Sequence, residues 1–387
     1  MIRNQKIKYL LINLKIIIFL LLAFLIRLFI KTKAKRFVIL WGHNLDGNLR
    51  AFFDHYHEKQ YADYELYFLA NNQKLYTKLK NKFGHSIFSA NKFKHIIKVF
   101  DCKCIITSHG PQTLHLLKIL SPKIAFIDVW HGTPFVEYEE WQLKTMKSYS
   151  ALFLPSEYVK NKYKSSFNFN KVEHVVTGLA RHDMLFEQNL KMNEIKKYLK
   201  LSSYEKIILF SPTWRQKDEP SEIPFNIGNK LFLQKMSEIM VKNNSILIFR
   251  LHQNSSSKIN FSDFQNIRML SQLDYPDTEK LLKITDILIS DWSSIITDYC
   301  VLDRPIIILD SHLPKSWISK KTWIDRGGYL AQSFDELLDL LLETMLNCNL
   351  VISQSQLAMK EQVIGSMFDG HTSSRYHEKI KKIILEN

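Results

Sequence analysis

Short apolar runs alternate with longer amphipathic stretches from Phe37 to the end of the chain. In the first half the apolar runs read FVILW, YELYFLA, CIITS, KIAFIDV, ALFLP and HVVTG. After a polar stretch near 187–204 the alternation restarts with KIILFSP, SILIFRL, ILIS and RPIIIL. Strands separated by helical stretches are typical of parallel sheets built from βαβ units. The pattern therefore predicts an α/β fold with two doubly wound, Rossmann-like domains at 37–187 and 188–387.

The first 36 residues have a different pattern and form a predicted membrane-associating segment, 1–36. Residues 9–30 are almost entirely apolar, with interruptions at Lys15 and Arg27 and basic residues on both flanks. The uninterrupted core 16–26 is shorter than the roughly 20 residues of a spanning helix. Single-pass spanning and peripheral anchoring to an anionic membrane surface both stay open.

Two further features of this segment indicate where the rest of the chain lies. No A-x-A-like cleavage site follows the apolar stretch, and the strand-like FVILW begins almost at once, which disfavours a signal peptide. The basic cluster is denser on the C-terminal side of the stretch. We therefore expect a cell-membrane protein whose two domains lie on the cytoplasmic side.

Composition narrows the class of partner. The 387 residues include 53 Lys and Arg against 38 Asp and Glu, a formal net charge of +15. Such an excess favours phosphate-bearing partners: nucleic acid, anionic lipid or a nucleotide-linked substrate. No helix-turn-helix, zinc-finger or RNP-type motif is present, so we expect no nucleic acid. The four cysteines contain no CxxC pair and are interpreted as free thiols in a reducing compartment.

Polar residues follow the predicted strands at the points where the strands end. In the first domain these stretches read WGHN, SHGP and WHGTP, each with a His beside a Gly; in the second they read SPTWR, RLHQN and SDWSS. Ligands of doubly wound sheets bind outside the carboxyl ends of the strands. Two rows of polar residues are therefore expected to face each other across a cleft.

The WHGTP stretch carries the candidate catalytic residue of the first domain. Gly132 allows a tight turn or a close approach to a ligand, and Pro134 suits the first turn of a helix. This arrangement leaves His131 at the edge of the sheet, where a pKa near neutrality suits a general base for a hydroxyl group. A purely structural histidine is the alternative interpretation.

The SDWSS stretch is the candidate phosphate site of the second domain. Ser293 or Ser294 is placed to cap the helix that follows the strand, and a free helix N-terminus suits a pyrophosphate. Asp291 and Asp298 are seven residues apart, so either is placed to meet ribose hydroxyls. A simple helix cap is the alternative interpretation.

Three other strand-end or turn stretches supply further candidates. Thr213 and Arg215 follow one strand and could hold phosphate oxygens, and Arg250 and His252 follow the next. Near the C-terminus, FDGHTSSR includes Arg375, which could reach back to a phosphate. Ordinary turns and solvated surface charges are the alternatives for each stretch.

Taken together and in this order, the WHGTP, SPTWR, RLH, SDWSS and DGHTSSR stretches resemble the CDP-glycerol glycerophosphotransferase family of teichoic acid synthesis over roughly residues 37–380. The resemblance implies a GT-B-like architecture, with an acceptor-side first domain and a second domain that binds CDP-glycerol. It implies transfer of glycerol phosphate to a hydroxyl of a saccharide linked to a membrane lipid, undecaprenyl diphosphate, with release of CMP. The expected enzyme is the short, primase-like kind.

The resemblance also assigns residue roles. It implies that His131 and His252 are catalytic, His131 being the family's HGTP histidine. Substrate contacts are expected from Gly132, Thr133, Thr213, Arg215, Arg250, Asp291, Ser293, Ser294, Asp298 and Arg375. The chain departs from the family pattern at Gln253, where Pro is common, and at TGLARHD, where a G-x-P-R-N-D-like stretch is usual. These departures concern the donor or acceptor more than the reaction type.

Several alternatives stay open. The first is a related activity, the transfer of polyol phosphate in capsule polysaccharide synthesis. The second is a GT-B glycosyltransferase that uses a nucleotide sugar. A membrane-tethered module that binds anionic polymers without catalysis is the third. No acidic cluster with metal-ligand spacing stands out, so we expect no required cofactor and leave Mg²⁺ open.

Overall fold

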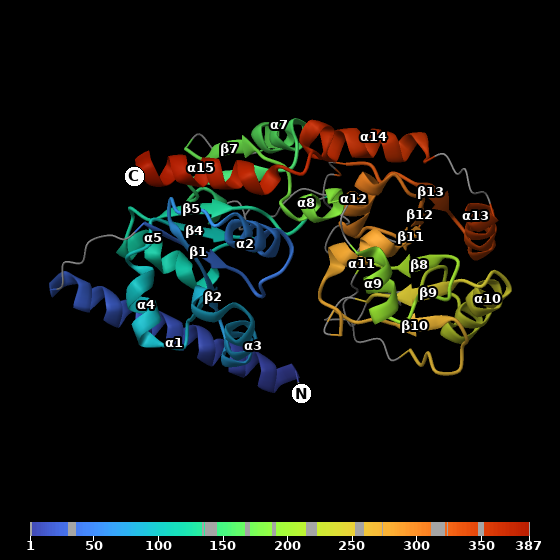
Figure 1. The fold of residues 1–387 in the computed structure, drawn as a ribbon, viewed down its shortest axis with the longest axis horizontal. Helices are drawn as coiled ribbons and strands as arrows, with labels where there is room; N and C mark the ends of the chain where they lie inside the picture. The colour runs from blue at the N-terminus through green and yellow to red at the C-terminus, as the bar shows by residue number, and fades with distance from the viewer. Residues whose placement is uncertain are drawn as a thin grey trace.

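The computed structural model of the chain describes residues 2–29, 36–133, 135, 145–166, 171–187, 191–213, 223–251, 259–272, 274–310, 322, 324–346 and 352–386. Two parallel β-sheets lie side by side within it (Figure 1). We call the part built on the N-terminal sheet the first unit and the part built on the C-terminal sheet the second unit. The prediction of an α/β fold with two parallel sheets is confirmed.

The first sheet contains seven described strands in the order β3-β2-β1-β4-β5-β6-β7. Their bounds are β1 Phe37–Trp41, β2 Glu65–Ala70, β3 Ile87–Ser89, β4 Cys104–Thr107, β5 Ala125–Asp128, β6 Ala151–Leu154 and β7 Glu173–Val176. The strand order reverses between β1 and β4, which is where doubly wound sheets bind their ligands. The three His-containing stretches follow β1, β4 and β5, so they gather at this point.

The second sheet contains six described strands in the order β10-β9-β8-β11-β12-β13. Their bounds are β8 Ile207–Phe210, β9 Ile246–Phe249, β10 Ile267–Met269, β11 Ile287–Ser290, β12 Ile306–Leu309 and β13 Tyr329–Ala331. Here the order reverses between β8 and β11, the strands followed by SPTWR and SDWSS. Both central strands of this sheet are buried throughout, as expected for a parallel sheet covered on both faces.

Helices connect the strands and cover the sheets. Those of the first unit are α1 Ile2–Phe29, α2 Gly47–Lys59, α3 Gln73–Phe83, α4 Phe93–Val99, α5 Leu117–Leu120, α7 Glu157–Ser166 and α8 Arg181–Phe186, with 3₁₀ turns η1 Gly84–Ser86 and η2 Gln112–Leu116. The remainder are α9 Met192–Tyr198, α10 Asn229–Lys242, α11 Thr278–Ile284, α12 Ile295–Tyr299, α13 Phe334–Leu346, α14 Gln354–Val363 and α15 Thr372–Glu386, with η3 Cys300–Leu302 and η5 Gly365–Met367.

The chain returns to the first unit at its C-terminal end. Helix α15 lies beside the first unit in Figure 1. The ring centroid of its Tyr376 lies 4.9 Å from that of Phe153 and 5.8 Å from that of Phe52. Asp183 accepts hydrogen bonds from the backbone N–H groups of Thr372 and Ser373 at the start of this helix. The two units are therefore tied together at α8 and again at α15. The boundary near residue 187 stays a prediction.

Helix α1 lies along the outside of the first unit (Figure 1). One stripe of the helix, with Ile16, Leu20 and Ala23, is fully buried among core residues of this unit. Asn13 accepts a hydrogen bond from Thr113, and Arg27 forms an ion pair with Asp101. Leucines on the rest of the helix are exposed: Leu10, Leu11, Leu14, Leu21, Leu22, Leu25 and Leu28. By length and composition alone, Leu10–Phe29 could cross a membrane.

Candidate functional site

Three histidines meet at the carboxyl ends of the central strands of the first sheet. His43 follows β1, His109 follows β4 and His131 follows β5. The ring centroids of His43 and His109 are 5.0 Å apart, and the rings of His109 and His131 stack with centroids 4.2 Å apart and planes 13° apart. Each of the three residues keeps solvent-accessible surface, while the protein packed around it desolvates the ring. The parallel register of β1, β4 and β5 brings these distant stretches into one row, which we call the histidine row.

The hydrogen bonding of His131 determines which of its ring nitrogens is available. Its Nδ1 lies 3.1 Å from the carbonyl oxygen of Ser108. Because a carbonyl oxygen can only accept, Nδ1 carries the hydrogen, and Nε2 of the neutral ring keeps its lone pair. Desolvation lowers the pKa of His131, and the charge of Arg181 lowers it further, against the opposing effect of the Ser108 hydrogen bond. His131 is therefore a neutral imidazole with a free basic nitrogen.

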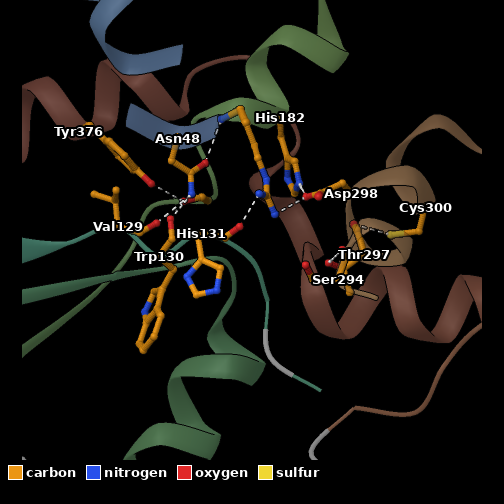
Figure 2. A network of polar contacts seen from close by, with 12 residues as sticks. Asn48, Val129, Trp130, His131, His182, Ser294, Thr297, Asp298, Cys300 and Tyr376 are labelled. Carbon is orange, nitrogen blue, oxygen red and sulfur yellow. Dashed lines mark hydrogen bonds and ion pairs between the residues drawn. The ribbon is translucent and has the colours of Figure 1, made fainter. Parts of the chain in front are cut away.

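The loop that carries His131 is held by two buried polar residues. Asp128 accepts hydrogen bonds from the N–H groups of Trp130, at 2.8 Å, and of Gly110, at 3.1 Å. The amide of Asn48 donates to the carbonyl oxygens of Val129 and Trp130 at 2.9 and 2.8 Å (Figure 2). Trp130 has a φ of +57°, which L residues adopt at a cost and only where neighbours enforce it. These contacts turn the chain sharply and present His131 at the sheet edge.

The carboxyl group of Asp128 is itself unusual. It is buried, and burial raises its pKa to about 6 even though the Trp130 N–H and the Thr107 hydroxyl, 2.8 Å away, stabilise its charged form. By joining the loops after β4 and β5, Asp128 fixes His109 and His131 relative to each other. Sequence reasoning missed this residue, although an acidic residue at the end of an apolar strand was a usable signal.

The histidine loop touches the second unit at Gly132. A Cβ atom built on Gly132 would lie 2.7 Å from Oγ and 3.0 Å from Cβ of Ser294, at the start of α12. Close by, the rings of Phe135 and Trp292 meet edge to face with centroids 6.5 Å apart. The structure therefore brings together two of the predicted stretches, WHGTP and SDWSS, at a seam between the units.

A buried ion cluster crosses the same seam. The Arg181 guanidinium donates through Nη1 to the carbonyl oxygen of His131 at 2.6 Å, and its Nη2 lies 2.7 Å from Oδ1 of Asp298. The same carboxylate oxygen accepts from Nε2 of His182 at 2.8 Å (Figure 2). The side chains of Arg181 and Asp298 are each 9% exposed. Arg181 thus connects α8, the loop that carries His131 and α12. The carboxylate of Asp298, which was expected to meet ribose, instead contacts Arg181 and His182 of α8.

Arg181 and His182 belong to the TGLARHD stretch, in which the chain departs from the pattern of the family that its motifs resemble. Sequence reasoning noted the departure but assigned these residues no role. An arginine followed by a histidine at the start of a short helix gives no signal of its own for a contact that spans more than a hundred residues. Only the packing of α8 against α11 and α12 creates it.

Asp291 organises the strand ends of the second sheet. Its Oδ1 accepts hydrogen bonds from the N–H and hydroxyl groups of Thr213, both at 2.7 Å, and from the N–H of Trp292 at 2.6 Å. Asp291 is 1% exposed, so its carboxylate lies beneath the surface that a ligand would touch. Thr213 and Asp291, both predicted site residues, are brought together by the neighbouring strands β8 and β11.

Helix α12 begins at the predicted place but is capped differently from the expectation. Ser294 is its N-cap residue, yet it has helical backbone angles of −62° and −10° and makes no side-chain capping hydrogen bond. The helix is five residues long and continues into η3. The predicted position of the N-cap residue is therefore confirmed, but the side-chain hydrogen bond expected of it is not made, because a helical N-cap residue does not turn its hydroxyl toward the following N–H groups. The Ser294 hydroxyl instead faces Gly132.

The remaining predicted residues are dispersed. Arg250 is buried and donates to the carbonyl oxygen of Tyr275 at 2.9 Å and to the Thr278 hydroxyl at 2.8 Å, which ties β9 to α11. Arg375 forms an ion pair with Asp369 at 2.7 Å and donates from Nε to a carbonyl oxygen in the loop after β7. His252 and Arg215 lie outside the described residues, as does Gln253.

Two further observations complete the inventory of the site. The hydroxyl oxygen of Thr133 is buried and has no hydrogen-bond partner among the residues described. Within the described part of the chain, no group of three or more His, Cys, Asp or Glu side chains could hold a metal ion.

The fold and site define a class: an α/β protein of two doubly wound sheets with a neutral histidine at the seam between them. The chain belongs to the family of CDP-glycerol:poly(glycerophosphate) glycerophosphotransferases, whose family model matches residues 20–380. The resemblance inferred from the sequence motifs is therefore confirmed.

Individual relatives support this membership. The chain is 29% identical over 201 residues to a teichoic acid poly(glycerol phosphate) polymerase of Bacillus spizizenii, which covers 47% of this chain and 50% of that protein. It is 24% identical over 299 residues to a teichoic acid glycerol-phosphate transferase of Staphylococcus aureus, with coverages of 68% and 74%. The chain thus spans half of the first of these relatives.

Solved structures share the fold. A variant of the wall teichoic acid polymerase TagF superimposes with a TM-score of 0.71 at 18% identity, over 92% of this chain and 90% of that one. Another TagF variant, soaked with CDPG, gives a TM-score of 0.69 at 17% identity, over 99% and 98% of the two chains.

Proposed function

We propose that this protein transfers glycerol phosphate from CDP-glycerol to a hydroxyl group of a lipid-linked saccharide in teichoic acid or related cell-surface polymer synthesis, releasing CMP. Family membership and the activities after which the relatives are named support the reaction class. The observation that carries the proposal is the neutral His131, whose free Nε2 lies on a loop in contact with the SDWSS turn of the second unit.

The reaction follows from this geometry. The acceptor hydroxyl gives its proton to Nε2 of His131, and its oxygen forms a bond to the β-phosphorus of CDP-glycerol. The bond from that phosphorus to the bridging oxygen breaks, and its electron pair leaves with CMP. Charge on the transferring group is balanced by hydroxyl groups of Ser293 and Ser294 near the seam, and the family resemblance adds His252 as a third phosphate contact.

The two units are proposed to form a GT-B-like pair of domains, 37–187 for the acceptor and 188–387 for the nucleotide. The nucleotide is placed at the carboxyl ends of β8 and β11, where the strand order of the second sheet reverses. Thr213 and the SDWSS turn lie at this position. No cofactor is required in this proposal, because the acid–base group and the phosphate contacts all come from the chain.

Membrane association is assigned to α1, lying in the interface on the cytoplasmic side. The exposed leucines would enter the boundary of an anionic bilayer while the buried stripe stays on the protein. Spanning would expose Ile16, Leu20 and Ala23 and break the contact of Asn13 with Thr113 and the ion pair of Arg27. The packing of α1 therefore supports peripheral anchoring over a single pass.

A second donor is favoured by a specific observation. Other relatives are ribitol-phosphate polymerases, among them one of Staphylococcus aureus that is 28% identical over 219 residues. Transfer of another polyol phosphate, in wall or capsule polymers, is therefore the second candidate. Competition between CDP-glycerol and CDP-ribitol for protection of the protein against heat separates the two.

The experiment that tests the function uses purified protein, membranes and radiolabelled CDP-glycerol. Label should enter lipid-linked saccharide and CMP should be released in equal amount. His131→Ala should remove most of this transfer while CDP-glycerol binding is nearly unchanged.

His85→Ala is the matched control. His85 precedes β3, so it lies at the amino ends of the parallel strands, whereas His131 lies at their carboxyl ends. Near-normal transfer by His131→Ala would contradict the role of His131, and failure of the unchanged protein with every CDP-polyol would contradict the function.

A further inference from the structure

The proposed mechanism uses one histidine of the row and leaves His43 and His109 without a task. Exposed histidines are ordinary on protein surfaces, but these two lie at the strand-order reversal of the first sheet, where ligands of such sheets bind. They also continue directly from His131, through the stacked pair of rings at 4.2 Å and the edge-to-face pair at 5.0 Å.

Each ring of the row has one nitrogen engaged and one available. Nδ1 of His109 lies 2.9 Å from the hydroxyl oxygen of Ser108, and Nε2 of His43 accepts from the Gln112 amide at 3.1 Å. The second nitrogens, Nε2 of His109 and Nδ1 of His43, have no hydrogen-bond partner in the part of the chain that the structure describes. Together with Nε2 of His131, the row offers three open ring nitrogens.

The chemistry of the row matches hydroxyl groups rather than phosphates. Desolvation and neighbouring charges lower the pKa of His109 to about 2, and desolvation lowers the pKa of His43 despite the nearby Asp46. The rings are therefore neutral at physiological pH, and the nearby Arg181 guanidinium is already paired with Asp298 at 2.7 Å, so the row presents no unpaired cation for a phosphate. A neutral ring nitrogen can donate to or accept from a hydroxyl group, and the ring face suits the C–H groups between hydroxyls.

We propose that His43 and His109 form an acceptor subsite beside His131, which binds adjacent hydroxyl groups at the end of the lipid-linked acceptor, including those of a polyol phosphate already added to it. This inference rests on the proposed function, and it adds the part of the acceptor that this chain recognises. When His109 binds one hydroxyl group of the acceptor, the adjacent hydroxyl group lies beside Nε2 of His131. The stacked ring then selects acceptors that carry two adjacent oxygen functions over acceptors with one.

The test compares two synthetic acceptors that share an octyl phosphate tail. One ends in glycerol phosphate, with two free hydroxyls, and the other in 3-hydroxypropyl phosphate, with one. We expect the unchanged protein to prefer the glycerol end by about tenfold in kcat/KM, the discrimination that one hydrogen bond provides. In His109→Phe, which keeps a stacked ring but lacks the nitrogen, this preference should fall to about twofold or less.

Controls make the outcome specific. CDP-glycerol affinity should change less than twofold in His109→Phe, because the nucleotide is proposed to bind at the second sheet, away from the histidine row. His85→Phe should behave like the unchanged protein. Should His109→Phe fold poorly, as judged by its melting temperature, His43→Phe supplies the same comparison.

Two results would overturn the inference. The first is an unchanged preference for the glycerol end in both Phe variants. The second is an equal loss of kcat/KM with both acceptors, which would mean that His109 only supports the ring of His131. Failure of the proposed function looks different, because the unchanged protein would then release no CMP with either acceptor.

Discussion

Gly132 and Ser294 touch across the seam so closely that a methyl group on Gly132 would lie 2.7 Å from the Ser294 hydroxyl oxygen. Real Cβ atoms essentially never approach another heavy atom to this distance, so the position admits only glycine while the seam is closed. The backbone of Gly132 does not lie in the left-handed region. Close approach between the units, and not backbone conformation, is therefore the reason for glycine here.

This contact leads to a prediction about Gly132→Ala. The added methyl should push the histidine loop away from α12, lower kcat at least tenfold, and cost roughly 1–3 kcal/mol of stability through overpacking. Steady-state kinetics and thermal unfolding measure both effects. Gly228→Ala is the control, since a Cβ there meets no atom within 4 Å.

The same collision can be removed from the other side. In a Ser294→Gly background, where Oγ and Cβ are absent, adding Gly132→Ala should cost little further activity. An equal loss in both backgrounds would show that the contact between these two residues does not limit kcat.

A second prediction concerns the ion cluster of Arg181 and Asp298. Both side chains are nearly buried, so Asp298→Asn leaves Arg181 without its partner and should lower the free energy of unfolding by roughly 3 kcal/mol. Because Arg181 also holds the carbonyl oxygen of His131, Arg181→Gln should lower kcat more than it raises the KM for CDP-glycerol. Denaturant unfolding and kinetics of both single variants provide these values.

The double variant tests whether the two residues act as a pair. Combining Arg181→Gln with Asp298→Asn should cost less than the sum of the single changes, with a coupling of about 1–3 kcal/mol. The exposed pair Lys382 and Glu386, with 3.8 Å between its charged atoms, should show a coupling near zero. If the changes in the free energy of unfolding at Arg181 and Asp298 are strictly additive, the two residues do not form an energetic link across the seam.

Much of this arrangement could be predicted from the sequence, because it depends on patterns that the chain repeats. Apolar runs separated by amphipathic stretches specify parallel strands, so the positions of His131, Thr213 and the SDWSS turn at strand ends could be predicted. Their roles in binding and catalysis stay predictions. Family motifs in a fixed order identified the family.

The contacts that hold the site together could not be predicted in this way. Asn48 and Arg181 act on backbone atoms or on partners that lie far away in the chain, and such contacts carry no sequence signal. Conversely, Arg250 and Arg375 stand in stretches that look suited to phosphate, yet in the structure their guanidinium groups contact groups of the protein. A basic residue at a strand end satisfies the sequence pattern whichever partner it has.

A third prediction concerns pH. His131 works as a base only when neutral, and desolvation lowers its pKa below the ordinary 6.5. The kcat/KM for transfer should therefore be constant from pH 8 down to about 6.5 and fall only at lower pH, as the ring of His131 becomes protonated. In Arg181→Gln the loss of a nearby positive charge should move this acidic limb toward higher pH.

The pH profile is measured from CMP release with CDP-glycerol below its KM. As a control, the stability of each variant is measured across the same pH range. This separates the titration of His131 from unfolding of the protein. An acidic limb above pH 7 in the unchanged protein would mean that His131 is not the neutral group inferred from its contacts.

The last prediction concerns how α1 meets the membrane. Leu14, Leu21 and Leu25 are exposed, whereas Ile16 on the same helix is fully buried. Replacing the three leucines by serine should release the protein from anionic vesicles by at least tenfold, since burial of each leucine contributes about 1.5–3 kcal/mol. The melting temperature should hardly change. Ile16→Ser should do the opposite, lowering the melting temperature and affecting vesicle binding less.

A helix α1 that crosses the bilayer would give different results. The protein would resist extraction from membranes by alkaline carbonate. Ile16→Ser would leave the melting temperature of the first unit unchanged, because that side chain would face lipid.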